Sequence, residues 1–325
     1  MSASGADFWK GKGVLVTGGA GFVGSHLVEK LLERGARVRV ADLPGPLASV
    51  NLAAARDRVE CLGVDLMRRD DCDRAAEGME IVLNLAAKVG GIAYNQSHQG
   101  TMFQTNSLLA LNMLEASSRA GVERHLVVSS ACVYGRDATI PTPESEGFLG
   151  DPEASNFGYG WAKRLAEVQA RAYSLQYGLR VAIARPFNAY GPRDRFDETG
   201  HVIASIIRRA CAGETPLTVW GTGRPTRSFL YVDDFVDGLM LVTEKHACAE
   251  PVNLCDGTEV RICELAAIVA RVVGLGAPIT YDRSKPDGQP CRVGDTALAA
   301  RLGFHPRVGL EEGIAKTVAW YRSQA

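Results

Sequence analysis

The chain lacks several features that would assign it quickly to a class of protein. It has no CxxC pair among its eight cysteines and no apolar run near the roughly 20 residues that span a bilayer. Lys and Arg number 36 and Asp and Glu 37, so no basic surface for nucleic acid is indicated. We therefore expect no metal site, no nucleic-acid partner and no membrane partner.

What is absent also bears on the cellular location. The spread of the cysteines fits reduced thiols better than a disulfide framework. The first residues, MSASGADFWKGKG, contain no apolar stretch of the kind found in signal peptides. We expect a cytoplasmic protein, whose 325 residues, 46% of them hydrophobic, can bury a large core without covalent cross-links.

Short runs of β-branched residues alternate with longer helical patterns through the first two thirds of the chain. The predicted strands are Gly13–Thr17, Arg37–Ala41, Arg58–Leu62, Ile81–Leu85, His125–Ser129 and Arg180–Ala184. Apolar residues at intervals of three and four predict helices over Phe22–Glu33, Phe103–Arg119 and Gly160–Tyr177. Such alternation is typical of right-handed crossovers and predicts an α/β fold with a doubly wound parallel sheet.

This alternation stops near Gly191, beyond which the chain has stretches rich in Gly and Pro, namely YGPRDRFDETG, WGTGRPTRS and SKPDGQP. Helical patterns over His201–Cys211, Cys263–Val273 and Leu310–Tyr321 separate them. We expect residues 1–190 to form the doubly wound domain and residues 191–325 a smaller α/β region that covers a substrate. Individual elements of the second region can return to the core of the first.

The first predicted strand runs directly into Gly18-x-x-Gly21-x-x-Gly24 and then into a helix. Glycines at this spacing permit a tight turn, let the main chain approach a pyrophosphate and allow close packing of helix on strand. The helix N-terminus, which includes Phe22 and Val23, offers free N–H groups to the anion. The sequence therefore predicts a Rossmann-type domain that binds a dinucleotide.

The acidic residue at the end of the second predicted strand bears on which dinucleotide binds. Asp42 is suitably placed to accept hydrogen bonds from a ribose 2′-hydroxyl, and its charge would repel a 2′-phosphate. This favours NAD as the cofactor. NADP stays possible because Arg37 and Arg39 lie nearby in the sequence.

Residues after the third and fourth predicted strands fit the same cofactor site. Asp65 and Leu66 come after the third strand, where an acidic side chain can meet the adenine amino group. Leu85, Ala86 and Ala87 end the fourth, where small residues let a cofactor lie against the main chain. Taken alone, either pair of features also fits ordinary packing or an exposed loop.

Tyr159 and Lys163 are predicted to stand one turn apart on the same face of a helix. A phenol, with a pKa of about 10, is a poor base at neutral pH. An adjacent ammonium and an oxidised nicotinamide both favour the phenolate and lower that pKa. An ordinary surface pair is the alternative, but its combination with the glycine loop favours a base beside the cofactor.

The blocks TGGAGFVGSHLVEKLL, NLAA, SSACVYG, YGWAK, RPFNAYGPR and RSFLYVDD together resemble the extended short-chain dehydrogenase/reductases, the nucleotide-sugar epimerase/dehydratase family. This resemblance covers essentially the whole chain and implies that Ser130, Tyr159 and Lys163 form a catalytic triad. Tyr159 would exchange a proton with a sugar hydroxyl, Ser130 would share that hydrogen bond, and Lys163 would hold the nicotinamide ribose. Asn106 would help to order Lys163, or else be an amide on a helix surface.

In this family the first step is oxidation at C4 of the sugar, and the residues beside the resulting ketone decide the next step. Dehydratases carry an Asp-Glu pair just after the Ser, where this chain has Ala131 and Cys132. A Cys here is similar to GDP-fucose synthases and GDP-mannose 3,5-epimerases, in which it helps to invert the carbons beside the ketone. The block ETGHVIASIIRRA resembles the fucose-synthase segment with the catalytic histidine, which makes His201 the expected partner; a surface histidine is the alternative.

Further blocks similar to the GDP-fucose synthases imply contacts with a nucleoside-diphosphate sugar. They are LAAKVGGIAYN, WGTGRPTRSFLYVDD and SKPDGQP, and they favour a GDP-sugar. Two arginines would bind the diphosphate, and a lysine would lie on the nucleotide side. The complete set of expected substrate-binding residues is Lys88, Gly90, Asn188, Arg209, Trp220, Arg227 and Lys285.

Three functions are compatible with these observations. The leading one is a nucleotide-diphospho-sugar epimerase that works through a 4-ketone, with Cys132 and His201 inverting C3, C5 or both, with or without a final reduction. Asp42 and the generic GGAGFVG loop favour a recycled NAD over net reduction by NADPH. The second is an NAD-dependent C4 epimerase in which Cys132 is merely small, and the third is a catalytically silent cofactor-binding scaffold. The resemblance also implies a homodimer formed through helices Phe103–Arg119 and Gly160–Tyr177.

Overall fold

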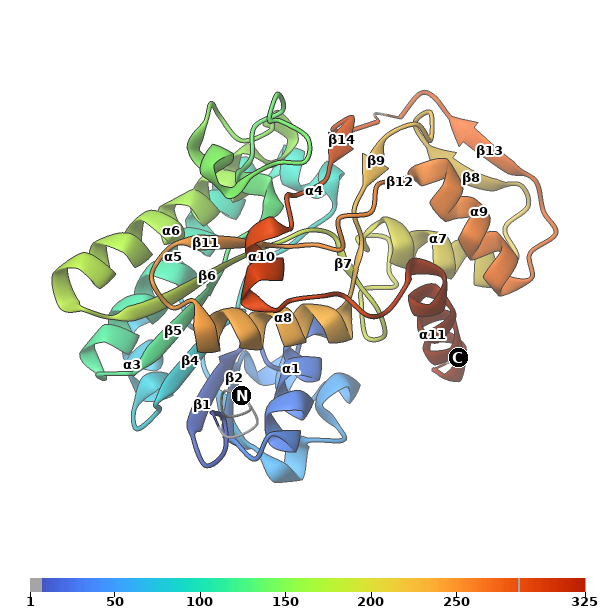
Figure 1. The fold of residues 1–325 in the computed structure, drawn as a ribbon. Helices are drawn as coiled ribbons and strands as arrows, with labels where there is room; N and C mark the ends of the chain where they lie inside the picture. The colour runs from blue at the N-terminus through green and yellow to red at the C-terminus, as the bar shows by residue number, and fades with distance from the viewer. Residues whose placement is uncertain (1–7, 286, 325) are drawn as a thin grey trace.

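A computed structural model describes residues 8–285 and 287–324, apart from the side chains at positions 92 and 93. The start of the segment for which we expect no signal peptide therefore lies outside the described residues. The molecule has a larger lobe built on a parallel sheet and a smaller lobe of helices and short strands, which holds the end of the chain (Figure 1).

The large sheet has seven strands in the order β11-β6-β5-β4-β1-β2-β3, and all neighbours are parallel. Its strands are β1 Gly13–Thr17, β2 Arg37–Asp42, β3 Glu60–Gly63, β4 Ile81–Asn84, β5 Arg124–Val128, β6 Arg180–Pro186 and β11 Pro251–Leu254. The doubly wound sheet predicted from the sequence is confirmed. β3 begins later than predicted because Arg56–Arg58 form a 3-10 turn.

Helices cover both faces of this sheet (Figure 1). On one face lie α1 Phe22–Glu33, α8 Val232–Lys245 and α10 Ala297–Leu302, and on the other α3 Arg69–Ala76, α5 Gln99–Arg119 and α6 Phe157–Tyr177. Because both faces are covered, a central strand can be apolar throughout. Val14, Leu15 and Val16 of β1 are indeed completely buried.

The smaller lobe has its own apolar core. Its elements are α7 Val202–Cys211, α9 Ile262–Val273, α11 Leu310–Ser323 and the paired strands β8 Leu217–Trp220 and β13 Ile279–Asp282. A three-stranded ribbon is formed by β12 Val260–Arg261, β9 Thr226–Arg227 and β14 Cys291–Arg292. The remaining elements are the pair β7 Ala189–Tyr190 and β10 Leu230–Tyr231, the short helices α2 Pro44–Leu47 and α4 Ile92–Ser97, and several 3-10 turns.

The C-terminal part of the chain passes back and forth between the two lobes. α8 and β11 come after the first helix of the smaller lobe in sequence but pack on the large sheet. β11 extends the sheet by parallel pairing with β6, from Pro251 opposite Ile183 to Leu254 opposite Pro186. The two lobes are therefore tied together by the main chain at several points.

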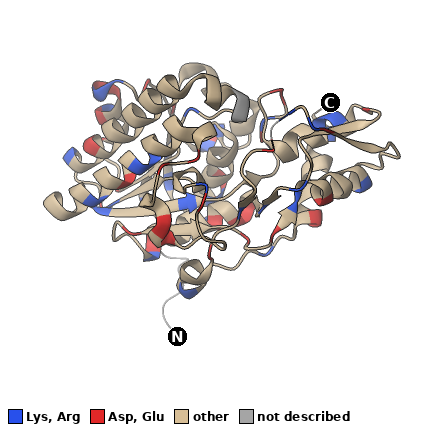
Figure 2. Cartoon of the chain, turned by 90° about the horizontal axis from the view of Figure 1, so that it is seen from above, with Lys and Arg blue, Asp and Glu red and all other residues tan. Residues whose placement is uncertain are grey.

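Within the described ranges, no helix is long and apolar enough to cross a membrane, and no group of three His, Cys, Asp or Glu side chains could hold a metal ion. Along the ribbon in Figure 2, the positions of Lys and Arg are interspersed with those of Asp and Glu. All eight cysteines are free.

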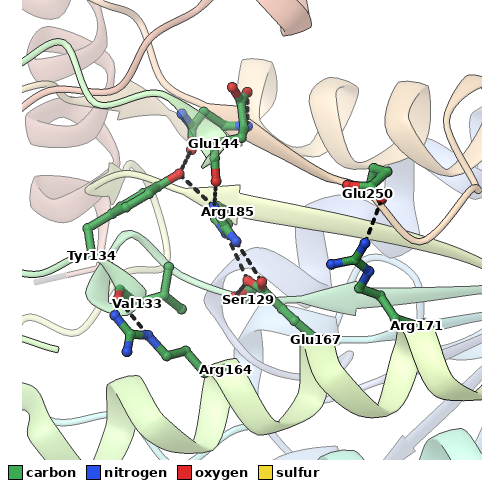
Figure 3. A network of polar contacts seen from close by, with 10 residues as sticks. Ser129, Val133, Tyr134, Glu144, Arg164, Glu167, Arg171, Arg185 and Glu250 are labelled. Atoms are coloured by element: carbon green, nitrogen blue, oxygen red, sulfur yellow. Dashed lines mark hydrogen bonds and ion pairs between the residues drawn. The ribbon is translucent and has the colours of Figure 1, made fainter. Parts of the chain in front are cut away.

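A buried ion pair joins α6 to β6. Arg185 Nε and Nη2 donate to the two carboxylate oxygens of Glu167, at 2.9 and 2.7 Å, and both side chains are almost completely buried. The Ser129 hydroxyl at the end of β5 also donates to Glu167 (Figure 3). A buried pair is stable only when such further hydrogen bonds satisfy its remaining polar atoms.

The network extends from Arg185 to neighbouring segments. Its Nη1 donates to the Tyr134 hydroxyl at 3.0 Å and to the Glu144 carbonyl at 2.6 Å (Figure 3). Tyr134 in turn donates to Asn253 Oδ1 on β11 at 2.5 Å. One ion pair therefore fixes the ends of three strands and the segment SSACVYG to the helix α6.

We expect Glu167→Gln to destabilise the protein strongly, because it leaves a buried guanidinium without its negative partner. The expected loss in the free energy of unfolding is about 3–5 kcal/mol, measured by urea denaturation. The matched control is Glu250→Gln. Glu250 is the exposed ion-pair partner of Arg171, which lies on α6 like Glu167, and this change should lower the free energy of unfolding by less than about 1 kcal/mol. Equal and small losses in both variants would contradict the importance of the buried pair.

Candidate active site

The glycine loop turns from β1 into α1 against the end of β4. Gly18 has a φ of +65°, and a Cβ there would lie 3.1 Å from the main chain of Ala86. A Cβ on Gly24 would lie 2.2 Å from the Gly18 carbonyl oxygen. Gly21 is the N-cap of α1, and no side chain caps this helix. The loop thus forms a cradle without side chains at a helix N-terminus, which fits a pyrophosphate.

Asp42 lies beside this cradle at the end of β2. Its carboxylate accepts hydrogen bonds from the main-chain N–H groups of Ala20, at 3.2 Å, and Leu43, at 2.9 Å, and burial raises its pKa. Arg37 and Arg39 point elsewhere, since both donate to main-chain carbonyls near other strand and helix ends. No arginine from β2 is therefore directed at a ribose beside Asp42.

The other expected cofactor residues lie at the same edge of the sheet. Asp65 Oδ1 accepts the N–H of Met67 at 3.0 Å, and Leu66 is buried. The N–H of Ala86 donates to Thr17 Oγ1 at 3.0 Å, which ties the end of β4 to β1. These residues fit a dinucleotide whose pyrophosphate lies on the glycine loop and whose ribose lies at Asp42.

Ser130, Tyr159 and Lys163 meet at the end of β5. The Ser130 hydroxyl lies close enough to the Tyr159 phenol to lower its pKa. Lys163 Nζ lies 5.4 Å from the centroid of the Tyr159 ring and donates to the Val128 carbonyl at 2.8 Å. The structure therefore brings together all three residues of the expected triad.

The electrostatics of Tyr159 differ from the expectation for a ready base. Burial raises the pKa of its phenol, and the neighbouring Ser130 hydroxyl only partly offsets this. Burial also lowers the pKa of Lys163 to about 8, so this residue is charged below that pH. The protein side chains around Tyr159 leave its pKa raised, whereas an oxidised nicotinamide, when bound, would supply a positive charge that lowers it.

Asn106 forms hydrogen bonds with the main chain of Lys88 and Met102 rather than with Lys163. It is buried, and its Nδ2 donates to the carbonyls of Lys88, at 3.0 Å, and Met102, at 2.8 Å. Its Oδ1 accepts the N–H of Lys88 at 2.9 Å. Asn106 therefore fixes the loop after β4 and is neither a surface amide nor a hydrogen-bond partner of Lys163.

Cys132 lies half-buried in a 3-10 turn that starts at Ser130, whose hydroxyl accepts the Cys132 N–H at 3.1 Å. Its most direct side-chain partner was not predicted from the sequence: Arg292 Nη1 donates to the Cys132 sulfur at 3.4 Å. Gln289 Oε1 accepts from Arg292 Nε at 3.0 Å and holds the guanidinium in place. The only local signal for Arg292 is its position just after SKPDGQP.

Arg227 lies next to Arg292 because their strands β9 and β14 pair in register. Its guanidinium donates to the carbonyls of Thr226 and Gln289, both at 2.7 Å. Burial and the charge of Arg292 lower the pKa of Arg227 to about 10. Two neighbouring guanidiniums beside the cysteine form a site suited to an anion.

His201 is the N-cap of α7 in the smaller lobe, and its side chain is 56% exposed. Its Nδ1 lies 3.6 Å from Asp194 Oδ1, and this carboxylate raises the pKa of the imidazole. The structure describes both side chains, and no hydrogen bond or ion pair joins His201 directly to Cys132. Asp194 is a second neighbour of the candidate site that the sequence analysis did not identify.

Two of the expected substrate residues come together at the far end of the smaller lobe. Lys285 Nζ lies 5.4 Å from the centroid of the Trp220 ring, which is 59% exposed. The pairing of β8 with β13 sets Trp220 opposite Asp282 and so brings Lys285 near it. An exposed aromatic face beside an amine is suited to a nucleotide base.

The other expected substrate residues have contacts within the protein. Arg209 pairs with Glu214 at 3.1 Å and donates to the Thr218 carbonyl, and Asn188 donates to the Ser228 carbonyl at 2.8 Å. Lys88 Nζ lies 5.7 Å from the centroid of the Tyr94 ring, and a Cβ on Gly90 would lie 2.7 Å from that ring. These contacts hold the side chains in place within their loops and helices, and the part of these residues in substrate binding stays a prediction.

Comparisons with known proteins agree with this geometry. The model of the NAD dependent epimerase/dehydratase family matches residues 14–255. The chain is 35% identical over 314 residues to the GDP-L-fucose synthase of Sinorhizobium fredii, with 94% of each chain covered. It is 34% identical over 324 residues to a dTDP-4-dehydro-6-deoxy-D-allose reductase of a Streptomyces species, with 98% of each covered.

A solved structure shows the same architecture. UDP-glucose 4-epimerase from Thermotoga maritima, crystallised with UDP-glucose, matches with a TM-score of 0.86 and 29% identity, over 96% of this chain and 99% of that one. Family model, relatives and structure agree on an NAD(P)-dependent enzyme of the extended short-chain dehydrogenase/reductase type. The chain therefore belongs to the NAD-dependent epimerase/dehydratase family of nucleotide-sugar enzymes.

Proposed function

We propose that the protein is a nucleotide-diphospho-sugar epimerase that works through a 4-ketone and inverts C3, C5 or both, with Cys132 and His201 as the acid–base pair. The observation that carries this proposal is the hydrogen bond from Arg292 to the Cys132 sulfur, two residues from Ser130 in the triad. A cysteine that is present only because it is small needs no charged donor. A thiol involved in proton transfer benefits from one, because the donor orients the sulfur and stabilises its negative form.

The reaction assigns a separate task to each group. Tyr159 takes the proton of the C4 hydroxyl, and Ser130 shares that hydrogen bond. NAD, when bound at the glycine loop and Asp42, supplies the acceptor for the C4 hydride. The ketone then acidifies the C–H bonds on C3 and C5. Cys132 and His201 would exchange protons with these carbons from opposite faces, and return of the hydride from the reduced cofactor to C4 would leave no net change in oxidation state. A substrate that already carries the 4-ketone would instead need one equivalent of NAD(P)H for a final reduction.

The cofactor and substrate preferences depend on the same residues. Asp42, with Arg37 and Arg39 of the same strand bonded elsewhere, supports NAD rather than NADP. The pair Arg227 and Arg292 suits a diphosphate, and Trp220 with Lys285 suits the base. Similarity to a GDP-L-fucose synthase supports a GDP-sugar as the substrate.

A second candidate is an NAD-dependent C4 epimerase. It is favoured by the structural similarity to a UDP-glucose 4-epimerase, and the triad alone is sufficient for it. In that reaction the keto-sugar turns over before the hydride returns, so Cys132 and His201 have no chemical task. A silent scaffold has no support, because the triad residues are in contact and the chain belongs to an enzyme family.

The two candidates differ in solvent exchange. We expect incubation with GDP-, UDP-, ADP- and dTDP-sugars and NAD in D₂O to place deuterium at C3 or C5 of one of them, mapped by NMR. Cys132→Ser and His201→Asn should abolish this label and leave NAD binding unchanged. A C4-inverted product without solvent deuterium would establish the second candidate instead, and full exchange in either variant would exclude that residue.

Arg292→Gln should slow the alkylation of Cys132 by iodoacetamide in the free enzyme. The expected effect is about tenfold, or about 1.4 kcal/mol, because a charged donor to the sulfur is lost. The rate is measured at neutral pH by mass spectrometry of the peptide that carries Cys132, and Arg292→Lys should restore part of it. Arg261→Gln, on the neighbouring strand β12 and exposed, is the control and should have no effect. An unchanged alkylation rate in Arg292→Gln would show that the contact between Arg292 and Cys132 does not support the proposed function.

We also propose that the protein is a homodimer formed through α5 and α6. Apolar side chains are exposed along these helices, among them Phe103, Phe157, Val168 and Leu175. Phe103, Phe157 and Trp161 line an open apolar groove between the two helices. A second copy of the same face would cover these side chains, as the family resemblance implies.

Val168→Asp combined with Leu175→Asp should convert the dimer to a monomer, because both charges would be buried in the interface. The measurement is the molar mass by light scattering after size exclusion. Val50→Asp, an exposed apolar residue outside α5 and α6, is the matched control and should leave the dimer intact. A wild-type monomer at micromolar concentration would contradict the proposal.

A further inference from the structure

The carboxylate next to His201 has no role in the reaction described so far. We propose that Asp194 is a positioning residue that holds His201 through Nδ1 and leaves Nε2 free to deliver a proton to the sugar. The inference rests on the proposed function only for the task of His201. The contact itself and its effect on the imidazole can be tested in the free protein.

Asp194 is a buried acid with unsatisfied bonding capacity. Its residue is 8% exposed, and its Oδ1 accepts the main-chain N–H of Arg195 at 2.7 Å. Its Oδ2 is buried and has no hydrogen-bond partner in the part of the chain that the structure describes. A buried carboxylate with one unpaired oxygen is costly, and the His201 imidazole, whose Nδ1 lies 3.6 Å from the other oxygen, Oδ1, offsets its charge when protonated. This distance is that of an ion pair, which can shorten to a hydrogen bond once a substrate orders the site.

The main chain holds Asp194 in this place by an uncommon conformation. Arg193, the residue before Asp194, has a φ of +68°, a left-handed conformation that is unfavourable for residues other than glycine. Its guanidinium forms an ion pair of 2.8 Å with Glu29 on α1, and the carbonyl of Pro192 lies 3.0 Å from His26 Nε2 on the same helix. The helix that begins at the glycine loop therefore fixes the turn that presents Asp194.

The loop from Asp194 to His201 closes tightly. A Cβ on Gly200 would lie 2.1 Å from the carbonyl oxygen of Arg195, so only glycine permits this approach. Asp197 stabilises the loop by accepting the N–H and the hydroxyl of Thr199, at 2.7 and 2.6 Å. The return of the chain brings His201 back beside Asp194, at the start of α7.

The charges around the imidazole oppose one another. Desolvation of the imidazole, the guanidinium of Arg195 and the positive end of α7 all disfavour a protonated His201. Asp194 outweighs them, and the pKa of His201 is raised above its ordinary value. A raised pKa means that the imidazole keeps its proton to higher pH, as a proton donor at neutral pH requires. Two further charges lie nearby, Asp197 in the same loop and Arg208 on α7, and they attract one another.

Asp194→Asn removes the charge while its amide oxygen can still accept the N–H of Arg195. We expect the His201 resonances of histidine-labelled protein, assigned by comparison with His201→Asn, to titrate at lower pH in this variant. Asp194→Glu should restore most of the shift. Asp197→Asn, three positions along the loop and exposed, is the matched control and should leave the titration unchanged. The melting temperature and NAD binding verify that each variant is folded.

The same variants give a second readout in the D₂O exchange assay. In Asp194→Asn the deuterium incorporation should fall off at lower pH than in the wild type, with the loss in kcat rather than KM. An unchanged His201 titration and exchange profile in Asp194→Asn would overturn the positioning role. Full exchange in His201→Asn would instead overturn the task of His201 in the proposed function, whatever the titration shows.

Discussion

The candidate active site depends on the buried ion pair between Glu167 and Arg185. Glu167 lies one turn after Lys163 on α6, so the carboxylate fixes the helix face that carries both Lys163 and Tyr159. Ser129, bonded to the same carboxylate, precedes Ser130, and Tyr134, bonded to Arg185, ends the turn that carries Cys132. Both sides of this turn are therefore anchored to one pair. Because desolvation offsets most of the attraction in such a pair, its main contribution is position rather than net stability.

The larger lobe could be predicted from the sequence because its signals are local. A strand buried on both faces is apolar throughout, an amphipathic helix repeats every three to four residues, and the glycine spacing of the phosphate loop is fixed by close approach. α8 and β11 were not predicted. The place of β11 depends on pairing with β6, far away in sequence, and a short apolar run such as Pro251–Leu254 does not encode its partner.

The contacts of the candidate site also divide into those that short sequence spacing predicts and those that depend on distant segments of the chain. Tyr159 and Lys163 are four positions apart on one helix, and the spacing alone predicts that they meet. Arg292 reaches Cys132 from 160 positions away through the pairing of β14 with β9, and no spacing indicates this contact. The electrostatics of Tyr159 also depend on tertiary structure, since its pKa is raised by burial, which a helical pattern does not reveal.

Each of the two proposed proton-transfer residues has a charged neighbour that is supplied or fixed by the other lobe. Cys132 comes after β5 of the large sheet, and its charged neighbour Arg292 comes from the C-terminal ribbon. His201 begins a helix of the smaller lobe, and its neighbour Asp194 is fixed to α1 of the larger lobe through Arg193 and Glu29. A relative movement of the lobes would therefore disturb both groups at once. In the proposed reaction, proton transfer at the sugar carbons therefore depends on contacts between the two lobes, whereas Ser130, Tyr159 and Lys163 lie wholly within the larger lobe.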